Sequence, residues 1–220
     1  MSEVVRVAIV DDEALLNSLL ADWLAMRPGF EVVGTFHDVA SVTAAAKSLA
    51  KDCDLMIVDV NLPDGDGLQV IHTVSKAAGH AIPAVVISGR PSSDLFERLY
   101  RELDGAWAML VKGSNGLANL EHAINAVRQG LVMVDPQLRQ STEVAGGPQL
   151  TDQERDVMKH VAMGGSNATV AGAVYMSEKS VERVLHSVYK KYGLEGTSKR
   201  DNPRVRATLM YLGLIAAPAK

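Results

Sequence analysis

Five polar residues stand at the ends of short apolar runs of this sequence, and their types suit phosphoryl transfer. Asp11 and Asp12 follow the first run, Asp59 ends the third, Ser88 the fourth and Lys112 the fifth. Ligands of open α/β sheets bind beyond the carboxyl ends of the strands, so we expect these side chains to lie together. Three converging carboxylates repel one another unless a hard cation lies among them, and such oxygen ligands suit Mg²⁺. The pattern therefore predicts an acidic magnesium site.

The same residues divide into a nucleophile and the groups that support it. An aspartate beside bound Mg²⁺ can attack a phosphoryl group while the metal and an ammonium neutralise the phosphoryl oxygens. Asp59 is the candidate nucleophile, and Lys112 is the candidate ammonium. Gly89 leaves room for a phosphoryl group beside Ser88, and the segment 61–67, NLPDGDG, predicts a rigid turn just after Asp59.

The elements that must position these residues alternate along the first 130 positions of the chain. Short apolar runs rich in β-branched residues are separated by longer segments with helical periodicity. Parallel strands need crossover helices, so the pattern predicts an α/β doubly wound fold with a five-stranded parallel sheet that is covered on both faces. We expect strands near residues 4–10, 30–36, 54–60, 83–89 and 106–112, and helices near residues 14–26, 39–49, 68–78, 95–103 and 116–129.

Length and charge divide the chain into two parts. A chain of 220 residues with 47% hydrophobic composition is expected to form two domains. A stretch rich in Pro, Gly, Ser and Gln predicts a linker at residues 132–149, between a domain at 1–131 and a domain at 150–220. Residues 1–147 hold 11 Lys and Arg against 19 Asp and Glu, whereas residues 148–220 hold 11 against 7. The positive excess of the second part suits contact with a polyanion.

We expect this sequence to carry neither a signal peptide nor a membrane-spanning helix. No apolar stretch reaches the about 18 residues of a membrane-spanning helix. The N-terminus, MSEVVRVAIVDDE, lacks the basic start and long apolar run of a signal peptide. We therefore expect a cytoplasmic protein with no membrane partner. The single cysteine, Cys53, has no second thiol with which to form a disulfide or a metal site, so we expect it in the core.

The segment VDVNLPDGDGLQV, with the early aspartate pair, the serine and the lysine at their strand ends, resembles the receiver domain of two-component response regulators over residues 4–130. The resemblance implies that a histidine kinase phosphorylates Asp59. It also implies that Asp12, Asp59 and the backbone carbonyl of Asn61 bind Mg²⁺ directly, while Asp11 acts through water.

The resemblance further implies roles for Ser88 and Lys112, which would contact the phosphoryl oxygens and shift the face formed by helix 4, strand 5 and helix 5. One position departs from the family. Receivers usually carry Tyr or Phe three residues before the strand-five lysine, whereas this chain carries Met109, which puts the aromatic rotamer switch in doubt. Trp107 lies two residues earlier, and we expect it to be an exposed or interface aromatic rather than a substitute.

The second domain has an all-helical pattern that begins with a capping box. Thr151 and Glu154 in LTDQERDV match the S/T-x-x-E signature of a helix start. Further helical segments near residues 167–174 and 178–192 are separated by a tight turn, which is the arrangement of a helix-turn-helix. A last helix begins at Pro203 and is expected to reach about residue 215.

The helix at residues 178–192 has two distinct faces. The apolar face predicts the inward stripe: Val181, Val184, Leu185, Val188 and Tyr192. The segments LTDQERDV and SVERVLHSVYKKYGL resemble the four-helix DNA-binding domain of the NarL/LuxR type. That resemblance implies contacts with base edges or nearby phosphates from one group of residues: Lys179, Glu182, Arg183 and His186. It implies backbone contacts from Lys190 and Lys191. Glu182 stands where the family commonly carries Lys, so the sequence preference is expected to differ.

Two features beyond this helix leave alternatives open. The loop EGTSKRDNP and the helix after it add basic residues that either contact phosphates or are solvated: Lys199, Arg200, Arg204 and Arg206. The last helix has an apolar stripe that either packs within its own domain or serves dimerisation: Val205, Leu209 and Leu212. A homodimer would bind two half-sites about one helical turn of DNA apart, or a multiple of that spacing.

The whole pattern predicts a transcriptional response regulator that is not an enzyme, with double-stranded DNA, a sensor histidine kinase and a second copy of itself as partners. Two other classes of protein share parts of this pattern. Phosphatases of the haloacid dehalogenase type also use an aspartate nucleophile with Mg²⁺, but they carry a second aspartate where this chain has Asn61. A phosphorylation-independent DNA-binding regulator that uses its receiver for protein interaction is favoured by Met109 and disfavoured by the intact acidic site.

Overall fold

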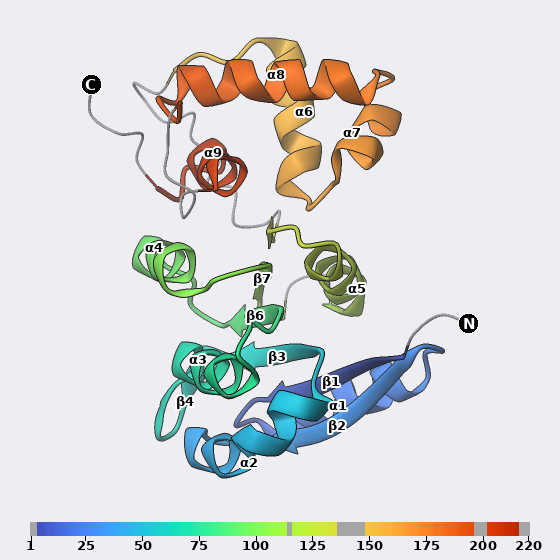
Figure 1. Cartoon of the computed structure of the whole chain (residues 1–220), viewed down its shortest axis with the longest axis vertical. Coiled ribbons are helices and arrows are strands. Elements are labelled where there is room, and N and C mark those ends of the chain that lie inside the picture. Colours follow the sequence, from blue (N-terminus) through green and yellow to red (C-terminus); the bar gives the residue numbers. More distant parts are fainter. Residues whose placement is uncertain (1–3, 114–115, 136–147, 196–201, 216–220) are drawn as a thin grey trace.

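The computed structural model of the chain describes residues 4–113, 116–135, 148–195 and 202–215. They form an α/β domain and a helical domain (Figure 1). The central parallel sheet has the strand order β2-β1-β3-β6-β7-β8, which confirms the predicted doubly wound fold. Within these described ranges, no helix is both long enough and apolar enough to cross a membrane.

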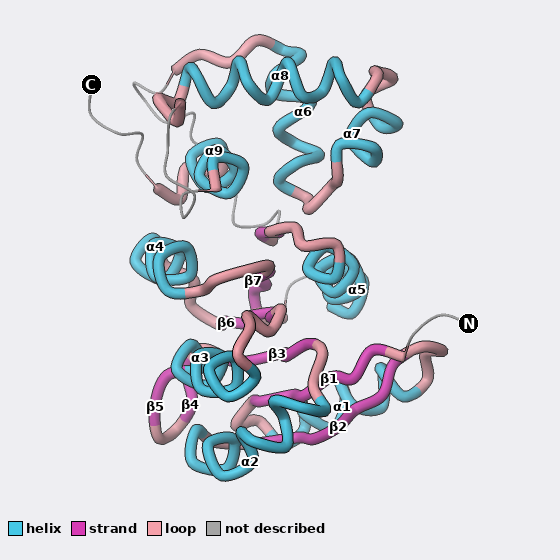
Figure 2. Tube along the Cα trace, viewed as in Figure 1, coloured by secondary structure: helices cyan, strands magenta, loops and turns pink. Residues whose placement is uncertain are grey.

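The bounds of the elements follow the predicted alternation closely. The strands of the main sheet are β1 (Val5–Val10), β2 (Phe30–Phe36), β3 (Leu55–Asp59), β6 (Ala84–Ser88), β7 (Trp107–Val111) and β8 (Met133–Val134). The helices of the α/β domain are α1 (Ala14–Ala25), α2 (Val39–Asp52), α3 (Gly67–Ala78), α4 (Ser93–Glu102) and α5 (Gly116–Arg128). A short hairpin of β4 (Asn61–Leu62) and β5 (Gly65–Asp66) lies beside α3 (Figure 2).

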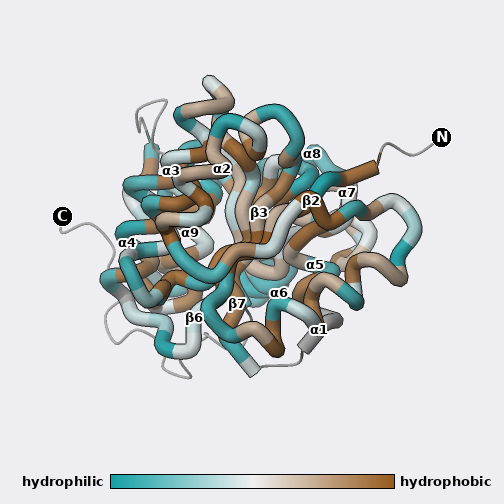
Figure 3. Tube along the Cα trace, turned by 90° about the horizontal axis from the view of Figure 1, so that it is seen from below, coloured by the Kyte–Doolittle hydropathy of each residue, from teal (hydrophilic) through white to brown (hydrophobic). Residues whose placement is uncertain are grey.

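Helices cover both faces of the sheet, which explains why its strands are almost wholly apolar. One core contains buried residues of α1 and α5 with the strand residues that face them, such as Ile9 and Ile57. The other contains buried residues of α2, α3 and α4 with the alternate strand residues, such as Val10 and Val58. Hydrophobic residues accordingly follow the strands at the centre of the molecule (Figure 3). Cys53 is buried in the second of these cores, as predicted.

The sheet has six strands rather than the five predicted. The additional strand β8 pairs in parallel with β7 through Met133 and Val134, which the sequence placed at the start of the linker. Asp135 continues the pairing, because its amide donates to the carbonyl of Met109 at 2.8 Å. Two residues are too short for a periodic pattern to show, so the strand was detectable only through its pairing.

The prediction that Trp107 is an exposed or interface aromatic is wrong, because its side chain is buried. It is 2% exposed and belongs to the same core as Met109, which is fully buried. The two residues are two positions apart on β7 and therefore point to the same face of the sheet. Position 109 does not have to accommodate a rotating aromatic ring, because the unbranched Met side chain is packed into the core.

The described residues of the C-terminal domain form four helices: α6 (Asp152–Ala162), α7 (Asn167–Ala173), α8 (Glu178–Lys191) and α9 (Pro203–Tyr211). Each begins at a residue whose side chain accepts a hydrogen bond from the first turn, namely Thr151, Ser166, Ser177 and Asn202. Thr151 and Glu154 form the predicted capping box. The last helix ends earlier than predicted because Gly213 follows its C-cap in the left-handed conformation.

The two domains touch through α9 and the end of α6. Helix α9 contacts α4. Its apolar stripe of Val205, Leu209 and Leu212 packs into the core that contains α2, α3 and α4. The Arg206 guanidinium lies 5.9 Å from the centre of the Tyr100 ring on α4. Helix α8 lies on the side of its domain that faces away from the sheet (Figure 1).

Candidate functional site

The three predicted carboxylates meet at the carboxyl edge of the sheet. Each of Asp11, Asp12 and Asp59 offers an oxygen that lies within 4.8 Å of the others. Asp59 is the last residue of β3, while Asp11 and Asp12 follow β1, its neighbour in the sheet. Asp11 and Asp59 are buried, and Asp12 is exposed. Parallel pairing of β1 with β3 is thus the feature that brings residues 48 positions apart into one site.

Lys112 lies at the centre of this acidic cluster, directly after β7. Its Nζ is 2.6 Å from Asp59 Oδ2 and 3.0 Å from Asp11 Oδ2. It also lies 2.8 Å from Glu13 Oε1. Burial alone would lower the pKa of Lys112, but hydrogen bonds to Asp59, Glu13 and Asp11 outweigh it and raise that pKa above its ordinary value. The lysine therefore stays charged and offsets part of the repulsion among the carboxylates.

Two residues of this site were not predicted from the sequence. Glu13 reaches Lys112 from the start of α1, and its place directly after the aspartate pair was the available signal. Asn17 is buried, and its Nδ2 donates to the carbonyl of Asp11 at 2.6 Å and to that of Phe36 at 3.0 Å. Asn17 thereby joins the ends of β1 and β2, a role that no motif indicates.

The turn after Asp59 approaches the strand end very closely. The amide of Asn61 donates to Asp59 Oδ1 at 2.9 Å, and the amide of Gly67 donates to the carbonyl of Val60 at 2.9 Å. A Cβ atom at Gly67 would lie only 2.0 Å from the carbonyl oxygen of Asp59. Glycine is therefore required at this position, and the predicted rigid turn is the β4-β5 hairpin.

Ser88 and Gly89 complete the edge beside Asp59. Ser88 is buried at the end of β6, and its Oγ accepts a hydrogen bond from the amide of Arg90 at 3.2 Å. Its carbonyl accepts from the amide of Lys112 at 3.0 Å, which holds the ends of β6 and β7 together. No atom of the described residues lies within 4 Å of the position that a Cβ of Gly89 would occupy. The open space predicted at Gly89 is therefore present.

The donor set fits a divalent cation such as Mg²⁺. Asp11 Oδ2 is buried and accepts no aligned hydrogen bond from the described residues, although the Lys112 ammonium lies beside it. Burial raises the pKa of Asp11, against the opposing effects of the Glu13 amide and Lys112. Carboxylate oxygens with free lone pairs at a partly open strand edge are the ligands that Mg²⁺ takes in proteins.

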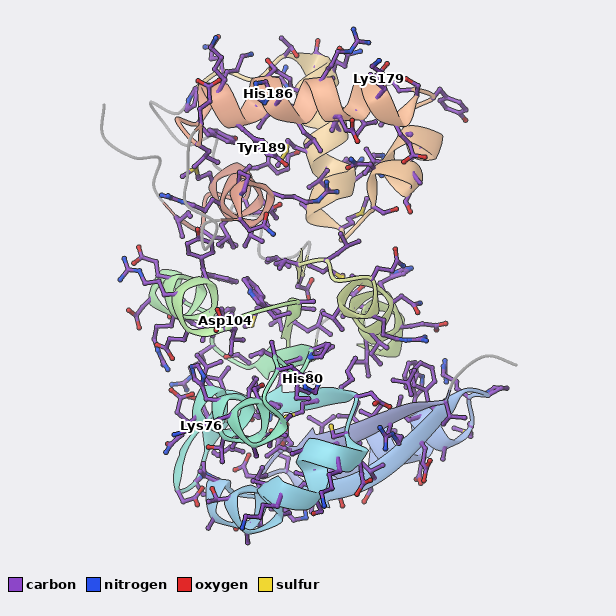
Figure 4. All side chains as sticks on the ribbon, in the orientation of Figure 1. Lys76, His80, Asp104, Lys179, His186 and Tyr189 are labelled. Atoms are coloured by element: carbon purple, nitrogen blue, oxygen red, sulfur yellow. The ribbon has the colours of Figure 1, made fainter. Side chains whose placement is uncertain are left out.

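The predicted DNA-contacting residues lie along α8, whose predicted inward stripe is buried except at Val184, which is half-buried. The residues Lys179, Glu182, Arg183, His186 and Lys190 are all exposed. The opposite side of the helix packs inward, with Tyr189 lying between α8 and α9 (Figure 4). The contacts given for this face in the described part of the chain are weak or local: His186 Nε2 lies 3.9 Å from Glu195 Oε1, and the Arg183 guanidinium donates to the hydroxyl of Ser180 at 3.2 Å. The exposed face is therefore available for contact with another molecule.

Lys191 differs from the other predicted DNA contacts, because it is engaged within the domain. Its Nζ lies 2.6 Å from Glu154 Oε2 and donates to the carbonyl of Gln149 at 3.2 Å. Ser187 donates to the other oxygen of Glu154 at 2.8 Å. Burial alone would raise the pKa of Glu154, but hydrogen bonds from Lys191, Thr151 and Ser187 lower it to about 2. The pair connects the start of α6 to the end of α8.

Glu154→Gln should lower the free energy of unfolding of the C-terminal domain by about 3 kcal/mol at pH 7. The folded pKa is depressed below the ordinary value, so this stabilisation is present above about pH 4.5 and is lost as the pH falls toward 2. Hydrogen exchange of α6 and α8 amides at several pH values measures it. The difference between wild type and variant should fall to less than half by pH 3. A difference independent of pH, or an equal loss in the exposed control Glu182→Gln, would contradict this assignment.

The structure describes two of the four basic residues near the last helix, and both contact other residues of the chain. The Arg204 guanidinium turns inward, donating to Asn167 Oδ1 at 2.8 Å and to the carbonyl of Gly165. Arg206 faces Tyr100 of the α/β domain. Lys199 and Arg200 lie outside the described residues. Neither Arg204 nor Arg206 is therefore a solvated side chain, and neither is placed for contact with phosphates in this arrangement.

Comparison with known families and proteins finds matches in both parts of the chain. Residues 7–125 match the response regulator receiver domain, which is more than half of the chain, and residues 148–199 match the luxR family of bacterial regulatory proteins. The nitrate/nitrite response regulator NarP of Escherichia coli is 28% identical over 94% of both chains. The transcriptional activator DevR/DosR of Mycobacterium tuberculosis is 28% identical over 93% of this chain and 94% of its own.

Solved structures show the same fold over the whole length. RcsB of Salmonella enterica serovar Typhimurium, bound to the promoter rprA, gives a TM-score of 0.51 at 20% identity and covers 96% of this chain and 99% of its own. A structure of two RcsB dimers bound to two parallel DNAs gives 0.53 at 19% identity, with 97% and 100% covered. The chain thus belongs to the two-component response regulators, in the group that joins a receiver domain to a LuxR-type helix-turn-helix domain.

Proposed function

We propose that this chain is a transcriptional regulator whose binding to DNA is switched when a sensor histidine kinase phosphorylates Asp59. The observation that carries the proposal is the 2.6 Å contact of Lys112 Nζ with Asp59 Oδ2 inside the cluster of three carboxylates. An oxygen of Asp59 attacks the phosphorus of a phosphohistidine and forms an acyl phosphate. The P–N bond breaks, and the imidazole leaves with its electron pair. The proposal places the protein in the cytosol.

Mg²⁺ is the cation that this proposal assigns to the site. Asp12, Asp59 and the backbone carbonyl of Asn61 would bind it directly, and Asp11 would act through water. When bound, the ion neutralises charge on the transferring phosphoryl group. Lys112 and Ser88 would hold the phosphoryl oxygens of the product, since Ser88 ends the strand next to that of Asp59 and the Lys112 Nζ lies 2.6 Å from Asp59 Oδ2.

The proposed DNA surface is the exposed face of α8. In a helix-turn-helix the second helix enters the major groove, and its exposed side chains reach base edges and phosphates. Arg183 and His186 would contact bases, with Glu182 accepting from cytosine. Lys179 and Lys190 would contact the phosphate backbone. Lys191 is assigned a smaller part, because its ammonium is already paired with Glu154.

The contact between the domains supports a specific form of the switch. In the part of the chain that the structure describes, the receiver covers the apolar stripe of α9, the surface that dimers of this family can use, and leaves α8 on the far side of its domain. The unphosphorylated protein would therefore be held as a monomer. Phosphorylation would shift the face formed by α4, β7 and α5, release α9 and allow two copies to bind paired half-sites.

One observation favours the phosphorylation-independent alternative. Met109 fills the position of the family's switching aromatic and is fully buried. An activation path through a rotating ring is therefore not open to this chain. The alternative predicts that DNA binding does not respond to phosphorylation at all.

Enrichment of fragmented genomic DNA on the purified protein tests the proposal, with one arm containing Mg²⁺ and a small acyl phosphate and the other containing EDTA and the same donor. We expect discrete repeat-containing sites that are enriched roughly tenfold more strongly in the Mg²⁺ arm. Equal enrichment in the two arms would support the phosphorylation-independent alternative. Absence of enrichment in both arms would contradict DNA binding.

A further inference from the structure

The turn of the helix-turn-helix carries an exposed aromatic residue in an unusual backbone conformation. Tyr175 has a φ of 54°, and it is the one residue other than glycine with a positive φ in the described ranges. Its side chain is 97% exposed. A left-handed conformation is unfavourable for a residue that carries a Cβ. The side chain recovers none of this cost by packing, because almost all of its surface is in solvent.

The geometry of the turn explains why the strain falls on this residue. Helix α7 ends at the C-cap Val174, and the amide of Met176 donates to the carbonyl of Ala171 at 2.9 Å. This bond closes a Schellman motif, whose first residue beyond the cap must be left-handed. Met176 then packs against the core of the C-terminal domain, as the motif requires. Tyr175 is therefore held in place by its neighbours while its own ring points outward.

The same domain uses glycine at the equivalent position of the other helices. Gly164 follows the cap of α6, Gly193 follows that of α8 and Gly213 follows that of α9, each with a positive φ. Glycine at position 175 would thus suit the fold better than tyrosine. The fold gives no reason for an aromatic ring there, so the reason is to be sought in a partner.

The position of Tyr175 identifies the class of partner. The first helix of a helix-turn-helix crosses the DNA backbone, where proteins usually place cations or hydrogen-bond donors. Here the segment 167–177, NATVAGAVYMS, contains no charged residue. The hydroxyl of Thr169 is already bonded to Ser166, and Asn167 accepts from Arg204. Tyr175 is the longest donor side chain of the segment, two residues before the N-cap Ser177 of α8.

We propose that Tyr175 binds the DNA backbone, its phenol hydroxyl donating a hydrogen bond to a phosphate oxygen at the edge of the groove that α8 enters. The inference rests on the proposed DNA-binding function and adds a contact that neither α8 nor the basic residues supply. A phosphate contact carries no sequence information, so it strengthens binding to every duplex equally. The phenol is an uncharged donor and displaces no counterion by charge neutralisation.

Three substitutions in the full chain test the contact, with fluorescence anisotropy on an enriched genomic fragment and on an unrelated duplex of equal length. Tyr175→Phe keeps the ring and the backbone strain but removes the hydroxyl, and it should weaken binding to both duplexes roughly tenfold. The slope of log affinity against log salt should not change. Lys179→Ala is the contrasting variant, because loss of a cation at a phosphate should lower that slope by about 0.9.

Tyr175→Gly removes both the ring and the strain. It should weaken binding at least as much as Tyr175→Phe, while the melting temperature stays unchanged or rises by about 2 °C. Weaker binding with an unreduced melting temperature separates the DNA contact from a folding defect.

Each other outcome overturns the inference. If Tyr175→Phe binds as tightly as wild type while Tyr175→Gly does not, the ring packs on a partner and donates to no phosphate. If both variants bind DNA as wild type but transcription falls, the partner is a protein. If the wild-type chain itself binds neither duplex, the proposed DNA-binding function fails together with the tyrosine contact.

Discussion

Asp59→Asn should abolish phosphorylation of the chain by a small acyl phosphate or by a histidine kinase. Asparagine has nearly the same shape but only one oxygen and no charge, so it can accept either from the Asn61 amide or from the Lys112 ammonium, both of which the native carboxylate contacts. It is not a nucleophile toward phosphorus, so the acyl phosphate cannot form. Intact-mass measurement should show near-complete modification of wild type in Mg²⁺ and none of the variant.

The same substitution should remove the response of DNA binding to the donor. Wild type should bind its sites roughly tenfold more tightly with donor and Mg²⁺ than without. Asp59→Asn should show one affinity under both conditions. Asp104→Asn, at an exposed position after α4, is the matched control and should behave as wild type. If Asp59→Asn is still modified at the wild-type rate, the phosphoryl group is carried elsewhere and the assignment of Asp59 is wrong.

Ala126→Glu should make DNA binding independent of phosphorylation. A Cβ at Gly164, in the turn after α6, would lie 2.8 Å from Ala126 Cβ on α5 and 3.1 Å from Met133 Cβ on β8. The backbone of the turn therefore lies directly on α5, and a longer side chain with a charge has no space there. We expect the C-terminal domain to leave the receiver and the affinity for DNA without donor to rise roughly tenfold, to the level of phosphorylated wild type.

Several measurements make this result specific. Small-angle scattering should show a larger maximum dimension for Ala126→Glu, and modification of Asp59 at the wild-type rate would show that its receiver is folded. Ala25→Glu, at an exposed position of α1, is the matched control.

The double variant Asp59→Asn, Ala126→Glu should bind DNA tightly although it cannot be phosphorylated. Separated domains with unchanged DNA affinity would contradict the proposed switch.

A second variant, at the contact between α9 and α4, tests whether the result of Ala126→Glu reflects separation of the domains rather than a change confined to α5. Arg206→Glu removes the cation that lies over the Tyr100 ring and should act in the same direction, but more weakly, because this contact is partly exposed.

The fold of the receiver was predictable because its strands are covered on both faces. Such strands appear in the sequence as nearly continuous apolar runs, so the charged residues that follow or end them, such as Asp59 and Lys112, indicated at which edge of the sheet the acidic cluster lies. The same argument missed β8, since Met133 and Val134 are too few for a pattern. It also missed Trp107, whose burial depends on which neighbours cover that end of β7.

The C-terminal domain was predictable for a related reason. Capping signals such as Thr151 with Glu154, and the periodic stripe of α8, are local in sequence and persist whatever the domain touches. Local pattern did not reveal that Lys191 is paired with Glu154, because that contact joins residues 37 positions apart. Nor did it reveal that Tyr175 occupies a left-handed turn position that glycine fills elsewhere in the domain.

The sequence by itself determined the two folds, the acidic strand-end cluster and the exposed cationic face of α8, because each follows from local periodicity or from the rule that parallel strands share an edge. Tertiary structure alone decided which surface of the C-terminal domain the receiver covers. An apolar stripe such as Val205, Leu209 and Leu212 has the same pattern whether it binds its own domain, a second copy or the receiver. Hydrophobic burial is non-directional, so the choice depends on the shapes that meet, and these exist only in the folded chain.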